Sequence, residues 1–154
     1  MFGTLKYRFA DTNDLDLLVQ LRLDFIEADR ENEQYDIIKE NCYSYFHNAL
    51  SEGLSDVILA EDEEMVVGTA IIFYYQSVPS AFNMTGRNAY VTSMYVNEEY
   101  RRKGIATTML NQLIDAANKK GYQIIMLNAS EMGKHLYTKF GFKEIQNGMI
   151  LKTM

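Results

Sequence analysis

The sequence has one cysteine, one proline and two histidines among its 154 residues. Because Cys42 has no second cysteine to pair with, no disulfide can form within the chain. His47 and His135 lack other ligands at metal-binding spacing, so we expect no metal site. We therefore expect a single domain, residues 1–154, held together by its apolar core, because a chain of this size buries roughly two-thirds of its unfolded surface.

Long apolar runs are also missing. The longest, Met65 to Tyr75, is interrupted by Gly68 and Thr69 and is too short to span a bilayer. The first ten residues, MFGTLKYRFA, lack the apolar stretch of a signal peptide. These features predict a protein without a membrane partner, located in the cytoplasm, where a single unpaired cysteine is also usual.

Positive charge is scarce, because 15 Lys and Arg face 21 Asp and Glu, for a net charge of −6. Broad nucleic-acid binding needs many basic contacts to phosphate, so we expect no nucleic-acid partner. Three of the basic residues, however, stand together as Arg101, Arg102 and Lys103. This local reversal of sign is the first indication of an anionic ligand.

Hydrophobic periodicity predicts strands that alternate with helices. The expected strands cover residues 4–10, 57–60, 65–75, 89–96, 124–127, 142–145 and 149–153. The expected helices cover residues 14–28 and 35–51, a stretch from about 104 to a stop at Gly121, and residues 131–140. Asn147-Gly148 is a type I′ hairpin signal between the last two strands. This order predicts an α/β or α+β fold with a mixed, largely antiparallel central sheet flanked by helices.

A basic turn with a glycine joins the strand at 89–96 to the third helix. The first N–H groups of a helix have no partner within the helix and favour a phosphate. Gly104 would let a ligand approach the backbone, and the small Ala106 keeps the first turn open. The pattern is neither a Walker A loop nor G-x-G-x-x-G. On spacing alone it is either a diphosphate site or a basic turn with a glycine at the bend.

The stretch YVTSMYVNEEYRRKGIAT, residues 90–107, resembles motif A of the GNAT family of N-acetyltransferases. The hallmark of that motif, [QR]-x-x-G-x-[GA], is met by Arg101, Gly104 and Ala106. The stretch LYTKFGF, residues 136–142, is similar to the L-Y-x-x-x-G-F of the same family. The resemblance implies the GNAT acyl-CoA N-acyltransferase fold, with acetyl-CoA as co-substrate and no metal.

The resemblance also implies where acetyl-CoA would bind. Backbone amides of the basic turn would hold the pyrophosphate, and the preceding strand would pair with the pantetheine arm. Ser130 stands where many relatives have an asparagine that touches this arm, although a serine there is equally a helix N-cap. The expected cofactor-binding residues are Met94, Tyr95, Val96, Arg101, Arg102, Lys103, Gly104, Ile105, Ala106, Thr107, Asn128 and Ser130.

Tyr137 resembles the family's tyrosine that faces the departing thiolate, and it is our candidate catalytic residue. A tyrosine has a pKa of about 10 and a thiol of about 8.5, so complete proton transfer is uphill by roughly 2 kcal/mol. We therefore expect Tyr137 to donate a hydrogen bond to the sulfur as charge develops. The alternative is an amphipathic core tyrosine beside Phe140.

No general base can be assigned. Histone-type relatives carry a glutamate eleven residues before the first motif position, and that position is Tyr90 here. The acidic residues between the first two helices border the acceptor site in the family, but a solvated acidic loop is the expected reading. They are Glu27, Asp29, Glu31 and Glu33.

These features predict that acetyl-CoA and an amine bind together and that the amine attacks the thioester directly. The amine itself stays open: a small molecule or a peptide, recognised by residues 22–40 and 76–88, which contain no motif. Two alternatives also stay open, a non-catalytic sensor of acyl-CoA and an acetyltransferase for charged tRNA. The family often dimerises, so a homodimer is one expected state.

Overall fold

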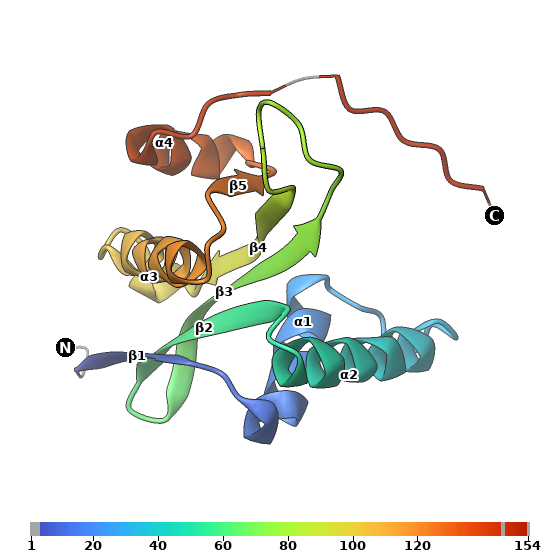
Figure 1. Ribbon diagram of the computed structural model, residues 1–154. Coiled ribbons are helices and arrows are strands. Elements are labelled where there is room, and N and C mark those ends of the chain that lie inside the picture. Colours follow the sequence, from blue (N-terminus) through green and yellow to red (C-terminus); the bar gives the residue numbers. More distant parts are fainter. Residues whose placement is uncertain (1–3, 146, 154) are drawn as a thin grey trace.

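A five-stranded sheet forms the centre of the computed structural model, which describes residues 4–145 and 147–153 (Figure 1). Its strands stand in the order β1-β2-β3-β4-β5. The first four pair antiparallel, whereas β4 and β5 are parallel. The strands are β1 (Leu5–Phe9), β2 (Ser55–Asp62), β3 (Met65–Gln76), β4 (Arg87–Val96) and β5 (Ile124–Leu127). The predicted mixed, largely antiparallel sheet is confirmed.

Four α-helices cover the two faces of this sheet: α1 and α2 pack on one face, α3 and α4 on the other (Figure 1). The helices are α1 (Leu15–Phe25), α2 (Tyr35–Ser51), α3 (Ile105–Lys119) and α4 (Glu131–Phe140). Short 3₁₀ turns precede α1, at Thr12–Asp14, and α3, at Glu98–Tyr100. No helix in the described part of the chain is both long and apolar enough to cross a membrane.

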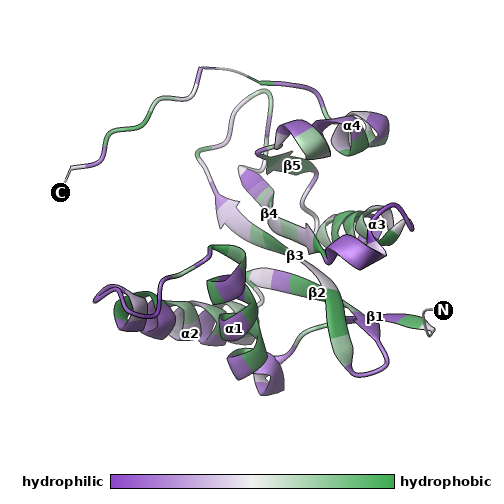
Figure 2. Ribbon diagram, turned by 180° about the vertical axis from the view of Figure 1, so that it is seen from behind, coloured by the Kyte–Doolittle hydropathy of each residue, from purple (hydrophilic) through white to green (hydrophobic). Residues whose placement is uncertain are grey.

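The central strands are buried on both faces. In β2, Val57 and Leu59 pack against α1 and α2, whereas Ile58 and Ala60 face α3. A strand with two buried faces reads as a continuous apolar run instead of an alternating one. In Figure 2 green, hydrophobic stretches lie within the central strands, and the connection between α1 and α2 is hydrophilic. The sheet is therefore a buried layer between two helical layers.

The two C-terminal strands expected from the sequence do not form, and that prediction is wrong. Residues 142–145 and 147–153 have no strand, and residues 147–153 extend away from the fold (Figure 1). A type I′ turn needs positive φ at both central residues, but only Asn147, at φ 96°, has it. Met149 and Ile150 lie almost fully in solvent. A turn signal cannot form strands without a partner surface, because an isolated hairpin is marginal in water.

The exposed tail generates a test with a matched pair of substitutions. Ile150 is 95% exposed, so Ile150→Ala should change the free energy of unfolding by less than about 0.5 kcal/mol. Ile72 in β3 is 0% exposed, and Ile72→Ala should cost about 2–5 kcal/mol by leaving a core cavity. Urea unfolding of both variants measures the two values. A loss above about 2 kcal/mol for Ile150→Ala would mean that the tail packs after all.

Candidate active site

The site begins where β4 and β5 part. The two strands pair over four positions, from Asn88 with Ile124 to Val91 with Leu127. β5 ends there, but β4 continues through residues 92–96, with Val96 still paired to Gly68 of β3 on its other side. The edge of residues 92–96 that faces away from β3 therefore has no strand partner among the described residues. Backbone groups on such an edge need another hydrogen-bond partner.

A β-bulge at Ser93 changes which side chains of β4 face which helices. Ser93 has φ of 56°, and the pairing with β3 skips a position between Thr92 and Tyr95. Before the bulge, Ala89 and Val91 pack on the α3 side, and after it the residues on that side are Met94 and Val96. An inserted residue explains this change of parity. The bulge thus sets the orientation of the three residues expected to meet the pantetheine arm, Met94, Tyr95 and Val96.

The basic turn leads from the end of β4 to the start of α3. Gly104 caps α3 in the left-handed conformation, at φ 81°, and a side chain built there would point into open space. The first helical bond runs from the N–H of Thr108 to the carbonyl of Gly104. The amides of Ile105, Ala106 and Thr107 consequently have no backbone acceptor in the described residues. They form the positive end of the α3 dipole, which suits an anion.

The charged side chains of the turn differ in position. Arg101 turns back, and its Nε donates to the carbonyl oxygen of Val96 over 3.0 Å, which links the turn to the open edge of β4. Arg102 and Lys103 are exposed beside the free amides. Positive charge therefore lies both at the end of β4 and at the start of α3. This arrangement favours a ligand that carries two neighbouring phosphates.

Tyr100 anchors the turn, a contact that the sequence did not reveal. Its buried hydroxyl donates to Asp62 Oδ2 over 2.6 Å, and Asp62 ends β2 at the β2–β3 hairpin. The hydrogen bond to this carboxylate is the main reason that the pKa of Tyr100 is raised to about 12. The residue before Arg101 is thereby fixed to the far end of the sheet. Nothing in the local sequence pattern pairs positions 62 and 100.

Tyr137 of α4 lies in the core cluster on the α3 side, with 8% of its surface exposed. Its ring packs edge-on against Phe142 at 5.9 Å between centroids, where the sequence suggested Phe140. No described residue hydrogen-bonds its hydroxyl, and burial raises its pKa above the ordinary value. A phenol already keeps its proton at neutral pH, and burial extends that range, so Tyr137 is available to donate a hydrogen bond although it is a weaker acid than a free phenol.

The other two expected cofactor-binding residues, Asn128 and Ser130, lie between the end of β5 and the start of α4. The hydroxyl of Ser130 caps the helix by accepting from the N–H of Gly133 over 3.1 Å, and it retains its own proton to donate. Asn128 is exposed just after β5. Gly133 fits closely under the catalytic candidate, because a Cβ there would lie 2.9 Å from Cε2 of Tyr137.

The opposite face of the sheet carries aromatic side chains. Tyr90, which replaces the histone-type glutamate, stacks on Phe73 with centroids 5.2 Å apart, and burial raises its pKa. The four acidic residues between α1 and α2 are all exposed, as a solvated loop would be. None of these four carboxylates is therefore a buried group that could serve as a general base on this face.

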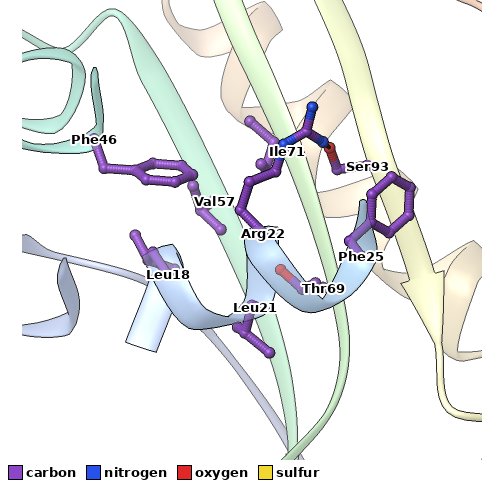
Figure 3. A pocket seen from close by; sticks show the side chains of 9 residues that line it. All are labelled: Leu18, Leu21, Arg22, Phe25, Phe46, Val57, Thr69, Ile71 and Ser93. Atoms are coloured by element: carbon purple, nitrogen blue, oxygen red, sulfur yellow. Dashed lines mark hydrogen bonds between the residues drawn. The ribbon is translucent and has the colours of Figure 1, made fainter. Parts of the chain in front are cut away.

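Two residues on that face were not named as site candidates, although Arg22 begins the stretch 22–40 that was expected to recognise the acceptor. Arg22 of α1 and Ser93 of the bulge line a cavity between α1, α2 and the sheet (Figure 3). The signal for Arg22 was present in the sequence. It stands at the spacing of the core residues Leu18 and Val19, where an arginine is unusual.

The chain is similar to known acetyltransferases over nearly its whole length. It is 24% identical to mouse (Mus musculus) thialysine N-epsilon-acetyltransferase, over 93% of this chain and 86% of that protein. A predicted acetyltransferase from Clostridium acetobutylicum, solved with acetyl-CoA, superposes with a TM-score of 0.86 and 31% identity over 97% of this chain and 96% of that one. A GCN5-related N-acetyltransferase from Ralstonia eutropha JMP134 shares the fold, with a TM-score of 0.81 and 19% identity over 97% and 99% of the two chains.

The model of the acetyltransferase (GNAT) family matches residues 16–142, which include both sequence motifs and every element of the candidate site. A match over this share of the chain settles the resemblance seen in the sequence. The chain belongs to the GNAT family of acetyltransferases.

Proposed function

We propose that this protein transfers the acetyl group of acetyl-CoA to a primary amine of a small molecule or peptide. The observation that carries the proposal is the unpaired edge of β4 leading directly into the free amides at the start of α3. An extended arm ending in a pyrophosphate matches both features in order along the chain. The crystal structure from Clostridium acetobutylicum supports the choice of acetyl-CoA, because that similar protein was solved with it.

Each expected residue has a part in holding this co-substrate. The amides of Ile105, Ala106 and Thr107 would receive the pyrophosphate at the end of the helix dipole. The backbone of Met94 to Val96 would pair with the pantetheine arm. Arg102 and Lys103 would add charge, and Arg101 would hold the turn against β4. Asn128 and Ser130 would contact the arm from the end of β5.

The transfer itself proceeds by direct attack. The neutral amine adds to the thioester carbonyl, the carbon–sulfur bond breaks as the thiolate leaves, and the nitrogen gives up one proton to solvent as the amide forms. Tyr137 donates a hydrogen bond to the sulfur as its negative charge grows, which lowers the barrier. An alkyl amine of pKa about 10.4 is neutral in only about one molecule in 2500 at pH 7. We therefore expect the rate to rise with pH while the phenol of Tyr137 keeps its proton.

The amine is to be found by a screen of acceptors that measures release of free thiol from acetyl-CoA. The mouse relative is named for acetylation at the N-epsilon position of thialysine. Thialysine is therefore the first acceptor to test, followed by polyamines, aminoglycosides and peptide N-termini. Thiol release above the hydrolytic background with any of these amines would support the proposal.

Binding of acetyl-CoA should stabilise the fold. A ligand at 100 times its dissociation constant adds about 2.7 kcal/mol to the free energy of unfolding. A thermal melt with millimolar acetyl-CoA should therefore shift upward by several degrees relative to the protein alone. Free cysteamine, which has the thiol without the phosphates, is the control. A melting temperature that ignores acetyl-CoA would count against the whole proposal.

Gly104→Glu should abolish binding of coenzyme A while the protein stays folded. The substitution places a side chain and a negative charge where the pyrophosphate would meet the backbone. Gly53→Glu is the matched control, because Gly53 also has positive φ and open space around it but lies beyond α2. Calorimetry with coenzyme A should detect binding in the control only. Equal affinity in the two variants would place the co-substrate elsewhere.

Tyr137→Phe should lower kcat about 10²-fold and leave the dissociation constant of coenzyme A nearly unchanged. The substitution keeps the ring that packs against Phe142 and removes only the hydroxyl, which acts when charge develops on sulfur. Tyr74→Phe is the control, since it removes another buried hydroxyl, one bonded to Asp56. Steady-state thiol release and calorimetry measure both quantities. Wild-type turnover in Tyr137→Phe would remove this residue from the mechanism.

A further inference from the structure

Arg22 occupies an unusual place for a cation. It extends from α1 toward the bulge of β4, where its Nη1 donates to Ser93 Oγ over 2.6 Å. Its guanidinium also lies 5.6 Å from the ring centre of Phe25. Together with Ser93 and Thr69 it forms the polar part of a cavity that is otherwise apolar (Figure 3). The apolar lining comes from Leu18, Leu21, Phe25, Phe46, Val57 and Ile71.

The protein does not neutralise this charge. A guanidinium has five N–H donors, and in the described residues only the bond to Ser93 accepts one of them. No carboxylate of those residues lies at ion-pair distance from Arg22. Arg8, by contrast, contacts both Asp14 and Glu61. A half-buried cation that bonds only a neutral hydroxyl is costly unless an anion completes it.

The position of the cavity relates it to the proposed reaction. Ser93 immediately precedes Met94, within the part of β4 that β5 leaves unpaired. The cavity lies on the α1 and α2 face of the sheet, whereas the turn at Gly104 and Tyr137 belong to the α3 and α4 side. If acetyl-CoA lies along β4, the amine can reach the thioester from the face that carries Arg22.

We infer that Arg22 binds a carboxylate of the acceptor, so that the substrate is a primary amine that also bears a free carboxylate, such as an amino acid or a short peptide. The inference rests on the proposed function. The cavity has a volume of about 20 Å³ and opens to solvent, so it has room for a small terminal group such as a carboxylate and not for a whole molecule. Arginine is well matched to this role, because its planar fork binds a carboxylate through two parallel hydrogen bonds.

Ser93 is the positioning residue for this contact. The left-handed backbone of the bulge aims its hydroxyl at Nη1, and this bond holds one side of the guanidinium. The remaining donors are then oriented for a ligand before it arrives. Preorganisation of this kind reduces the entropy lost when the ligand binds.

The test compares amines that differ only in the carboxylate. The pairs are L-lysine with L-lysinamide and glycylglycine with glycylglycinamide, each assayed by thiol release and by calorimetry on the protein saturated with coenzyme A. In the wild type, the carboxylate member of at least one pair should have a kcat/KM and an affinity about 10- to 100-fold higher than its amide. In Arg22→Gln this ratio should fall to near one. Arg22→Lys should give an intermediate ratio, because it keeps the charge and loses the fork.

Two controls separate recognition from other effects. Lys6→Gln removes one charge from an exposed position of β1, outside the cavity and outside residues 22–40 and 76–88, and should leave the ratio unchanged. Ser93→Ala should lower the ratio but not abolish it. A thermal melt of Arg22→Gln checks the fold, and a variant that is folded yet shows the wild-type ratio would give Arg22 only a structural tie between α1 and β4.

The two readouts distinguish this inference from the proposed function. Turnover with the same kcat/KM and affinity for the carboxylate and the amide in every pair would support the proposed reaction and overturn the inference. Carboxylate-selective binding that depends on Arg22, without any turnover, would keep the inference and overturn the proposed reaction. The absence of selectivity in both readouts would overturn the inference whatever the turnover.

Discussion

β5 stops at Leu127, and in the part of the chain that the structure describes the residues of β4 from 92 to 96 have no strand partner on that side. Backbone N–H and C=O groups inside a protein need hydrogen-bond partners. An extended ligand lying along this unpaired edge would supply them. The other parts of the site depend on this gap. The basic turn follows directly from the unpaired strand, and α4 begins four residues after β5 ends.

Local sequence patterns were enough to predict most of the fold and the candidate binding site for the co-substrate. Buried strands, amphipathic helices and a glycine at a strand-to-helix junction are all encoded within short windows, and motif A lies within one such window. The features that were not predicted correctly depend on residues far apart in the sequence, or on the absence of a surface for a segment to pack on. Asn147-Gly148 has the right residues for a hairpin, but nothing packs on Met149 and Ile150. The bond between Tyr100 and Asp62 joins positions 38 residues apart, and no pattern relates them.

The proposed acceptor side was the least predictable part of the candidate site, for a similar reason. Arg22 looked like one more position on a helix face, and Ser93 like one more residue of a regular strand. Their contact becomes visible only in the structure, where the bulge turns Ser93 toward α1. Its hydroxyl then accepts a hydrogen bond from Arg22, although the two residues are 71 positions apart in the sequence. The two sides of the described structure then differ in character. One has free backbone amides and exposed cations at the start of α3, and the other has the half-buried guanidinium of Arg22 in an apolar wall.

Gly133 carries a consequence for how freely this protein can vary. A glycine inside a helix sacrifices about 0.5–1 kcal/mol relative to alanine, so selection for a sturdy α4 would favour replacing it. Any side chain there would collide with the ring of Tyr137 one turn later, since its Cβ would lie 2.9 Å from Cε2. The ring of Tyr137 thus prevents a substitution at position 133 that would otherwise stabilise α4. Position 133 is a place where thermal robustness and placement of the phenol pull in opposite directions.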